Sequence, residues 1–256
     1  MISLGPIREY RLSNGLYVAL QETPTKTVSG KLNINFGALH EKEGEEGLAH
    51  FLEHAIMSGG TRKYTPDQMD NIKSNLGYIN AGTGLTRISI IGDVLPEDLR
   101  RYLDFVSEVA FNPRFEGKKV DEERQRVLRE IADKKSSPDY KDYFELKTAL
   151  FGDHPANRFI LGDESVVEHA TTDDLRKLHS RGYNANNMNL ILVGALPPEI
   201  EDLITSNFED KPTGQQTSYQ FPPLRDLPER VILQKHAPYL YTPDNPQASA
   251  AEVDLV

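Results

Sequence analysis

Residues 46–57 constrain the fold more than any other segment, because they place three polar side chains on a helix that is otherwise apolar. A helix that is apolar all round lies in the interior of a protein. After Gly47 its only polar members are His50, Glu53 and His54, and the pair Gly59-Gly60 ends it. The apolar members point in nearly every direction around the axis: Leu48, Ala49, Phe51, Leu52, Ala55, Ile56 and Met57.

The spacing of these polar residues predicts a metal site. Residues four apart share one face of a helix, so His50 and His54 can reach the same ion, and neutral imidazole suits zinc. Glu53 projects beside them, where it can take a proton from a water held by the metal. The alternative is a pair of histidines that only hydrogen-bond in the core. The carboxylate on the same buried helix favours one zinc ion per chain, since a metal satisfies all three groups.

A third ligand must come from elsewhere, because a catalytic zinc usually has three protein ligands. The helix predicted over 118–135 offers Glu122, Glu123 and Glu130. Glu123 and Glu130 share a face and flank the apolar stripe, so they are candidates for a ligand and for a group that supports one. Glu122 lies four residues before Arg126 and fits a solvated ion pair. For Glu130 the helix by itself leaves a ligand and an exposed salt bridge equally open.

Composition limits the chemistry further. The chain has no cysteine, which excludes disulfides, thiolate metal sites and a cysteine nucleophile. Its net charge of −10 argues against nucleic acid as a partner and weakly favours basic ligands. The acidic run at 41–46 is predicted to be a solvated loop before the helix N-terminus. We expect the other histidines to be structural, with His40 in an exposed loop and His154 in a turn that supports the site; the rest are His169, His179 and His236.

Nothing in the sequence indicates a membrane. No run approaches the ~20 apolar residues that a spanning helix needs, and the N-terminus lacks the pattern of a secretory signal. We therefore expect a cytoplasmic protein with no membrane partner.

The order of predicted elements indicates an α+β fold. Asn14-Gly15 between two alternating runs predicts a hairpin within residues 8–37, and further strands are expected over 78–81, 86–92 and 189–194. Helices separate these strands, and Thr65 and Thr172 are candidate N-caps. The prediction is a mixed or antiparallel sheet covered by one helical layer, rather than a regular βαβ winding.

Composition also suggests the domain limits. Residues 1–210 form the predicted zinc-bearing domain, and the Gly, Gln, Ser and Pro content of 211–228 is typical of a linker. Residues 229–256 are predicted to be a C-terminal strand and tail. Their first strand is placed at Glu229–Gln234, and it resembles the start of a second unit.

The order His-x-x-Glu-His is that of the inverzincins, and its surroundings resemble the pitrilysin family, which includes insulin-degrading enzyme and mitochondrial processing peptidase. The similarity runs over roughly residues 8–208. It is carried by Gly47-Leu-Ala-His50-Phe-Leu-Glu53-His54, Gly59-Gly60-Thr61, Asn80-Ala81, Thr83, Thr86, Glu123-Arg124, Val127-Leu128, Glu130-Ile131, His154-Pro155, Ile160-Leu161-Gly162, Tyr183-Asn184 and Asn187-Met188.

The resemblance implies a zinc peptidase that hydrolyses peptides or oligopeptides. In such an enzyme His50, His54 and Glu130 bind zinc, Glu53 is the general base and Glu123 assists it. Asn80 and Ala81 then lie on the edge strand where the family pairs with an extended peptide, whose main-chain bonds give weak sequence preference.

One departure from the family concerns the second half of the enzyme. Family members enclose a peptide between the zinc-bearing half and a similar second half, which supplies an Arg and a Tyr. This sequence has no evident counterpart of that segment, so we expect a longer enzyme, a homologous partner subunit or a homo-oligomer. The alternative function is a non-catalytic, partner-dependent subunit of the same fold. A third possibility, the autoinducer synthase that shares the motif order, requires a cysteine.

Overall fold

A six-stranded sheet forms the centre of the protein. The computed structural model describes residues 5–223, 231–233 and 251–253. The spatial order of the strands is β1-β2-β6-β3-β5-β4, and all neighbours are antiparallel except β2 and β6. The strands are β1 (Ile7–Arg11), β2 (Tyr17–Glu22), β3 (Val28–Ile34), β4 (Tyr78–Thr83), β5 (Ile88–Val94) and β6 (Met188–Gly194). The predicted mixed sheet is confirmed.

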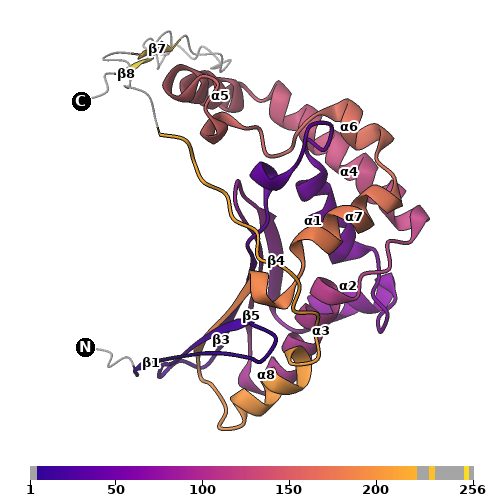
Figure 1. Ribbon diagram of the computed structural model, residues 1–256, viewed down its shortest axis with the longest axis vertical. Coiled ribbons are helices and arrows are strands. Elements are labelled where there is room, and N and C mark those ends of the chain that lie inside the picture. Colours follow the sequence, from indigo (N-terminus) through magenta and orange to yellow (C-terminus); the bar gives the residue numbers. More distant parts are fainter. Residues whose placement is uncertain (1–4, 224–230, 234–250, 254–256) are drawn as a thin grey trace, which may run out of the picture.

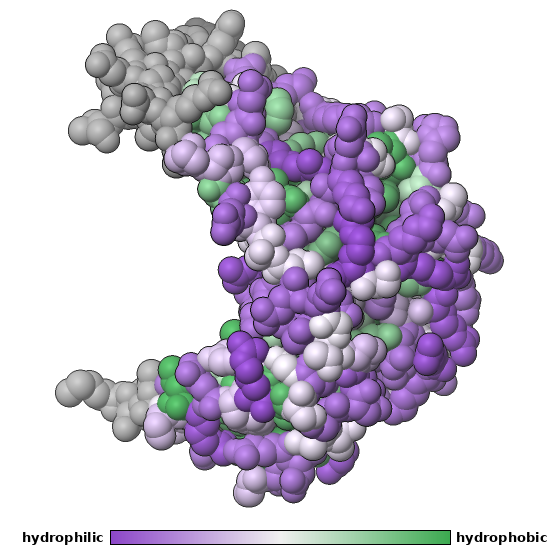
Figure 2. Space-filling model, in the orientation of Figure 1, coloured by the Kyte–Doolittle hydropathy of each residue, from purple (hydrophilic) through white to green (hydrophobic). Residues whose placement is uncertain are grey.

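Helices cover one face of this sheet, and the opposite face borders the hollow of a crescent (Figure 1). Burial alternates along the strands, since Leu190 and Leu192 are fully buried whereas Asn189 and Ile191 are partly exposed. The convex surface is mostly hydrophilic (Figure 2). The helices are α1 (Leu48–Ser58), α2 (Pro66–Asn75), α3 (Leu99–Phe111), α4 (Gly117–Ser136), α5 (Pro138–Phe151), α6 (Glu164–His169), α7 (Thr172–Gly182) and α8 (Ile200–Phe208). The predicted α+β class is confirmed.

One helix cap and one whole helix differ from the prediction. Thr65 caps α2 as predicted: its hydroxyl accepts from the Gln68 amide, and its own amide donates to the Gln68 side-chain oxygen. The cap of α7, however, is Thr171 and not Thr172, because Thr171 has the extended backbone that lets its hydroxyl accept from the Asp174 amide. Helix α6, which Asp163 caps, was not predicted from the sequence.

The C-terminal part of the described chain contains a separate two-stranded sheet of β7 (Val231–Leu233) and β8 (Ala251–Val253). Before it, an extended segment contacts the turn between α7 and β6, through hydrogen bonds from the Ala185 amide to the Pro212 carbonyl and from the Thr217 amide to the Asn187 side chain. The proposed limits at 1–210, 211–228 and 229–256 stay predictions. Within the residues that the structure describes, no helix has both the length and the apolar character needed to cross a bilayer.

Asn14 does more than form the first turn. Gly15 has a φ of 91°, a conformation that favours glycine, as the Asn-Gly signal predicts. The Asn14 side chain is buried, and its amide nitrogen lies 2.6 Å from the Phe208 carbonyl and 3.2 Å from the Lys211 carbonyl. A helix leaves its last carbonyls without internal partners, so Asn14 anchors the end of α8 to the hairpin.

Asn14→Ala is expected to lower the free energy of unfolding by about 2 kcal/mol, because it leaves buried carbonyls without donors. Urea denaturation monitored by circular dichroism measures this loss. Asn71→Ala, at an exposed position of α2, is the matched control and should change stability by less than about 0.5 kcal/mol. Equal stability of the two variants would contradict the anchoring role.

His179 lies in the core, in agreement with a structural role. Its ring stacks on Tyr183 at 4.5 Å, and its Nε2 lies 2.8 Å from the Ala110 carbonyl. Burial lowers the pKa of His179 to about 4, although the bond to Ala110 opposes the shift. The folded protein therefore holds this imidazole neutral at pH values where the unfolded chain protonates it.

This burial predicts a pH-dependent stability. A histidine with a depressed pKa contributes fully above about pH 6.5, and the contribution is lost as the pH falls toward 4. Between pH 7 and pH 5 the wild type should lose about 2 kcal/mol more than His179→Gln, measured by urea denaturation at both values. His169→Gln, at an exposed helix end, is the control variant. Parallel losses in the wild type and His179→Gln would refute the assignment.

Candidate metal centre

Helix α1 is buried along its length, as its composition predicts. His50 and Glu53 are only 7% and 8% exposed, among fully buried neighbours such as Phe51 and Leu52. Gly47 precedes the helix with a φ of 98° and lies against the Leu161 carbonyl, so closely that a Cβ atom there would be 2.4 Å from the oxygen. The start of α1 is therefore fixed against the segment 158–162.

Glu41 holds the N-terminus of α1, and the prediction of a solvated acidic loop is wrong for this residue. Its buried side chain accepts hydrogen bonds from the amides of Gly47 (3.1 Å) and Ala49 (2.7 Å). Arg158 donates to its other oxygen at 2.7 Å. The first amides of a helix lack internal partners and attract negative charge, which explains why this one carboxylate of the run turns inward.

Glu41→Ala is expected to reduce the free energy of unfolding by about 3 kcal/mol, because it leaves the partly buried Arg158 and two buried amides unpaired. Glu43→Ala, in the exposed part of the same loop, should be nearly neutral. Urea denaturation of both variants gives the comparison. A Glu41→Ala variant as stable as the control would show that the buried pair does not hold α1.

Two histidines of α1 and one carboxylate of α4 converge on a single point. Glu130 Oε2 lies 3.7 Å from His50 Nε2 and 3.5 Å from His54 Nε2. One donor atom of each residue lies within 4.8 Å of the others. Ligands held at about 2.1 Å around a tetrahedral ion are separated by about 3.4 Å, so these distances fit a metal better than direct hydrogen bonds.

The protonation state of His50 also suits a metal. Burial and the neighbouring His54 lower the pKa of His50 to about 3, so its imidazole is neutral, the form that binds cations. The pKa of His54 is raised, because the hydrogen bond to Glu123 and the charges of Glu53 and Glu130 outweigh the lowering effect of burial. The set of two imidazoles and one carboxylate is typical of zinc sites.

Glu123 supports this arrangement from α4, seven residues before Glu130. It is 3% exposed, and its Oε2 lies 3.2 Å from Nδ1 of His54. A carboxylate on the second nitrogen of a ligating imidazole fixes the ring and its tautomer. Arg126 pairs with the other oxygen of Glu123 at 3.4 Å. The predicted solvated ion pair of Glu122 is confirmed, although its partner is Lys119 at 2.7 Å and not Arg126.

Glu53 faces strand β4. Thr83 of this strand donates its hydroxyl proton to Glu53 Oε2 at 2.7 Å. Burial raises the pKa of Glu53, and the Thr83 bond opposes this shift. The sequence assigned no role to Thr83, because nothing local shows that the end of β4 meets α1.

Strand β4 is at the edge of the sheet, as the resemblance implied for Asn80 and Ala81. Both residues line a pocket of about 530 Å³ that also contains the three convergent residues, Glu53 and Glu123. The side chains that could bind a metal and the unpaired edge of β4 therefore lie in the same pocket.

The remaining histidines do not join this cluster among the described residues. His40 is not in an exposed loop, because it is half-buried and stacks on Phe36 at 5.2 Å. His154 does not support the site: its ring stacks on Phe221, and its Nε2 lies 2.9 Å from the Pro222 carbonyl. His169 bonds to the Ser165 carbonyl. His236 lies outside the described residues.

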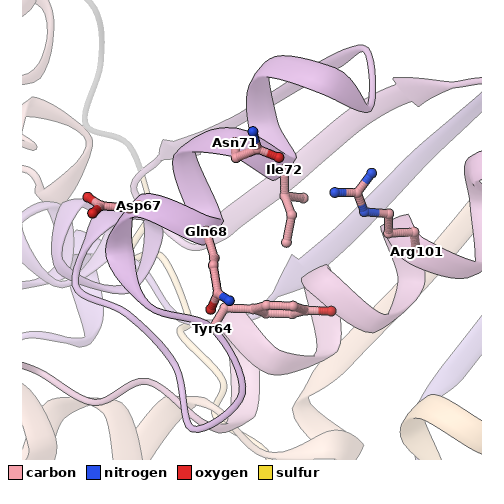
Figure 3. Close-up of a pocket in the computed structure, with 6 residues that line it drawn as sticks. All are labelled: Tyr64, Asp67, Gln68, Asn71, Ile72 and Arg101. Atoms are coloured by element: carbon pink, nitrogen blue, oxygen red, sulfur yellow. The ribbon is translucent and has the colours of Figure 1, made fainter.

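A second pocket, of about 400 Å³, lies beside α2 (Figure 3). Arg101 and Tyr64 extend into the space beside Ile72, whereas Asp67 points away from it. Its lining contains one carboxylate and no histidine, so it offers no metal-ligand set; the other lining residues are Gln68 and Asn71.

Comparisons with known proteins agree with this geometry. The family model "Insulinase (Peptidase family M16)" matches residues 17–164, more than half of the chain, and "Peptidase M16 inactive domain" matches residues 169–251. The chain belongs to peptidase family M16. The resemblance to the pitrilysin and insulinase peptidases is therefore confirmed, and all residues of the convergent cluster fall within the first match.

Individual relatives include zinc proteases and processing peptidases. An uncharacterized zinc protease of Rickettsia bellii is 31% identical over 193 residues, 74% of this chain and 46% of the relative. A probable mitochondrial-processing peptidase subunit beta of Arabidopsis thaliana is 28% identical over 222 residues, 84% of this chain and 42% of the relative. The chain thus spans less than half the length of these relatives.

A solved structure shares the fold. The first half of the periplasmic protease PqqL from Escherichia coli matches with a TM-score of 0.79 and 24% identity. The match covers 86% of this chain and 49% of that structure, and the same similarity covers 25% of the complete PqqL chain.

Proposed function

We propose that this M16 family member is a zinc-dependent peptidase that hydrolyses peptide bonds in peptides or oligopeptides. The convergence of His50, His54 and Glu130 beside Glu53 is the observation that carries the proposal. The family membership and the relatives named zinc proteases support it.

The metal would be held by His50, His54 and Glu130, with one ion per chain. A zinc ion bound there would act as a Lewis acid, which can polarise a carbonyl group and lower the pKa of a water molecule. The partners already described, Glu123 on His54 and Thr83 on Glu53, hold the ligand ring and the base in place. Glu53 takes a proton from the attacking water and delivers it to the leaving amine nitrogen.

The edge of β4 would hold the substrate. An extended peptide can add to an exposed strand edge through main-chain hydrogen bonds, which fix its direction but not its sequence. Asn80 and Ala81 lie on this edge and line the pocket of the metal centre. Their main-chain groups would align the scissile bond with Glu53.

A second structural unit is part of the proposal. The chain covers 46% and 42% of two relatives that it matches, so their remaining halves have no counterpart in it. We propose that a homologous subunit, a second copy of this chain or a further half completes the enclosure around the peptide and contributes the family's Arg and Tyr.

Glu53→Gln tests the catalytic assignment. The variant should retain one zinc ion per chain, measured by inductively coupled plasma mass spectrometry, because Glu53 is not a ligand. Its rate of peptide cleavage should fall by about 10² to 10⁴-fold, the usual contribution of a general base. Glu43→Gln, in the exposed loop, is the control. Cleavage by Glu53→Gln at the wild-type rate would contradict the assignment of Glu53 as the general base.

The same assay separates the peptidase from a non-catalytic subunit. Cleavage is measured for the zinc-loaded chain alone and after addition of a candidate second unit. A peptidase cleaves in at least one condition, and the Glu53→Gln chain abolishes that activity. Cleavage that survives Glu53→Gln in the mixture would place catalysis in the partner.

A further inference from the structure

The wall of the metal-centre pocket contains two cations besides the residues of the proposed mechanism. These are Lys73 and Arg126, and the apolar part of the wall includes Ile160 and Leu161. Two cations in a pocket that otherwise contains three glutamates call for an explanation, because the mechanism does not use them.

Lys73 reaches the pocket from α2. Its Nζ lies 3.1 Å from the Met57 carbonyl and 2.8 Å from Asp70. Met57 follows His54 by three residues, which is about 4.5 Å along a helix axis. The ammonium group therefore lies beside the last turn of α1, about one helical turn beyond His54.

Arg126 reaches the same pocket from α4. It lies four residues before Glu130, about 6 Å along the axis toward the start of α4, where Lys119 is within electrostatic reach of Asp67 in α2. Its side chain is 63% exposed, and among the described residues it forms one ion pair, with Glu123 at 3.4 Å. A guanidinium has five N–H donors, so this single contact leaves donors available.

Strand β4 relates these cations to a bound peptide. Thr83 contacts Glu53 at the metal centre, and Ile79 lines the pocket four residues earlier along the same strand. Since a strand advances by about 3.3 Å per residue, an added peptide would extend about 13 Å over this distance. Helix α2, which carries Lys73, packs against β4. Peptide side chains two to four residues from the scissile bond would therefore lie toward the two cations.

We propose that Lys73 and Arg126 form a carboxylate-binding subsite that selects peptides with an acidic group two to four residues from the cleaved bond. The inference rests on the proposed peptidase function and names part of its substrate class. The acidic group is an Asp or Glu side chain or a free C-terminal carboxylate. The net charge of −10 by itself favours basic ligands, so the proposed selectivity depends on these two cations and not on the overall charge of the chain.

A purely structural role would have a different consequence. Lys73 also stabilises the C-terminus of α1, and Arg126 also holds Glu123. If these structural roles were their only ones, substitution of Lys73 or Arg126 would change the cleavage of acidic and neutral peptides by the same factor. Only a subsite changes the ratio between them, so the ratio is the quantity to measure.

The experiment compares peptides that differ by one charge. The zinc-loaded chain, with its second unit where cleavage requires one, receives peptides carrying Glu or Gln at each of four positions on either side of the bond. A second set ends in a carboxylate or an amide. We expect kcat/KM to favour the acidic member by about three- to tenfold on one side of the bond, and less at high salt.

Variants then assign the preference to the two cations. In the double variant Lys73→Gln/Arg126→Gln the ratio should fall close to one. Arg129→Gln removes an exposed cation of α4 that does not line the pocket, so it should keep the wild-type ratio. Peptide affinity for the Glu53→Gln chain, measured by fluorescence anisotropy, provides the same ratio without turnover.

The outcomes separate the subsite from the peptidase function. A wild-type ratio near one at every position and terminus, or a ratio that persists in the double variant, overturns the subsite while cleavage of neutral peptides continues. If the wild type neither cleaves nor binds any peptide of the set, neutral ones included, the proposed function fails and the subsite fails with it.

Discussion

The structure depends on the burial of two imidazoles and a carboxylate within one apolar helix. Desolvated polar groups of this kind destabilise a fold unless every one of them has a partner. The surrounding elements supply partners for His54 and Glu53: α4 provides Glu123, and β4 provides Thr83. Among the described residues His50 Nδ1 has no hydrogen-bond partner, and Glu130 faces the Nε2 atoms of both imidazoles at 3.5 to 3.7 Å, a separation that suits two ligands of one ion.

The first amides of α1 also need hydrogen-bond partners. Glu41 accepts from the first amides of the helix and pairs with Arg158, which belongs to the segment whose next residues line the metal pocket. One buried carboxylate therefore connects the helix that carries the histidines to a wall of the cavity. Because the interior is close-packed, a shift of this wall would be transmitted to the ligands.

Sequence reasoning was accurate where the information is local. The period of a helix places His50, Glu53 and His54 on one buried segment, and the Asn14-Gly15 pair predicts a hairpin turn. It was wrong where two conformations differ by little energy or where a distant partner decides. Thr171 and Thr172 have the same side chain and could cap the helix equally well, so only the backbone angles make Thr171 the cap. Glu41 and Glu43 look alike in the sequence, and one is buried because Arg158 and α1 meet it.

The sequence by itself determined the ligand types, the helix that carries two of them and the absence of cysteine chemistry, because these follow from residue identity and helical period. It left Glu130 open between a ligand and a surface residue, and only the family resemblance favoured the first. The tertiary structure decided that Glu130 meets both imidazoles, that Thr83 meets Glu53, and that Lys73 and Arg126 share a pocket with them. These residues come from separate elements, and their convergence depends on how α2, α4 and β4 pack around α1, which no local pattern encodes.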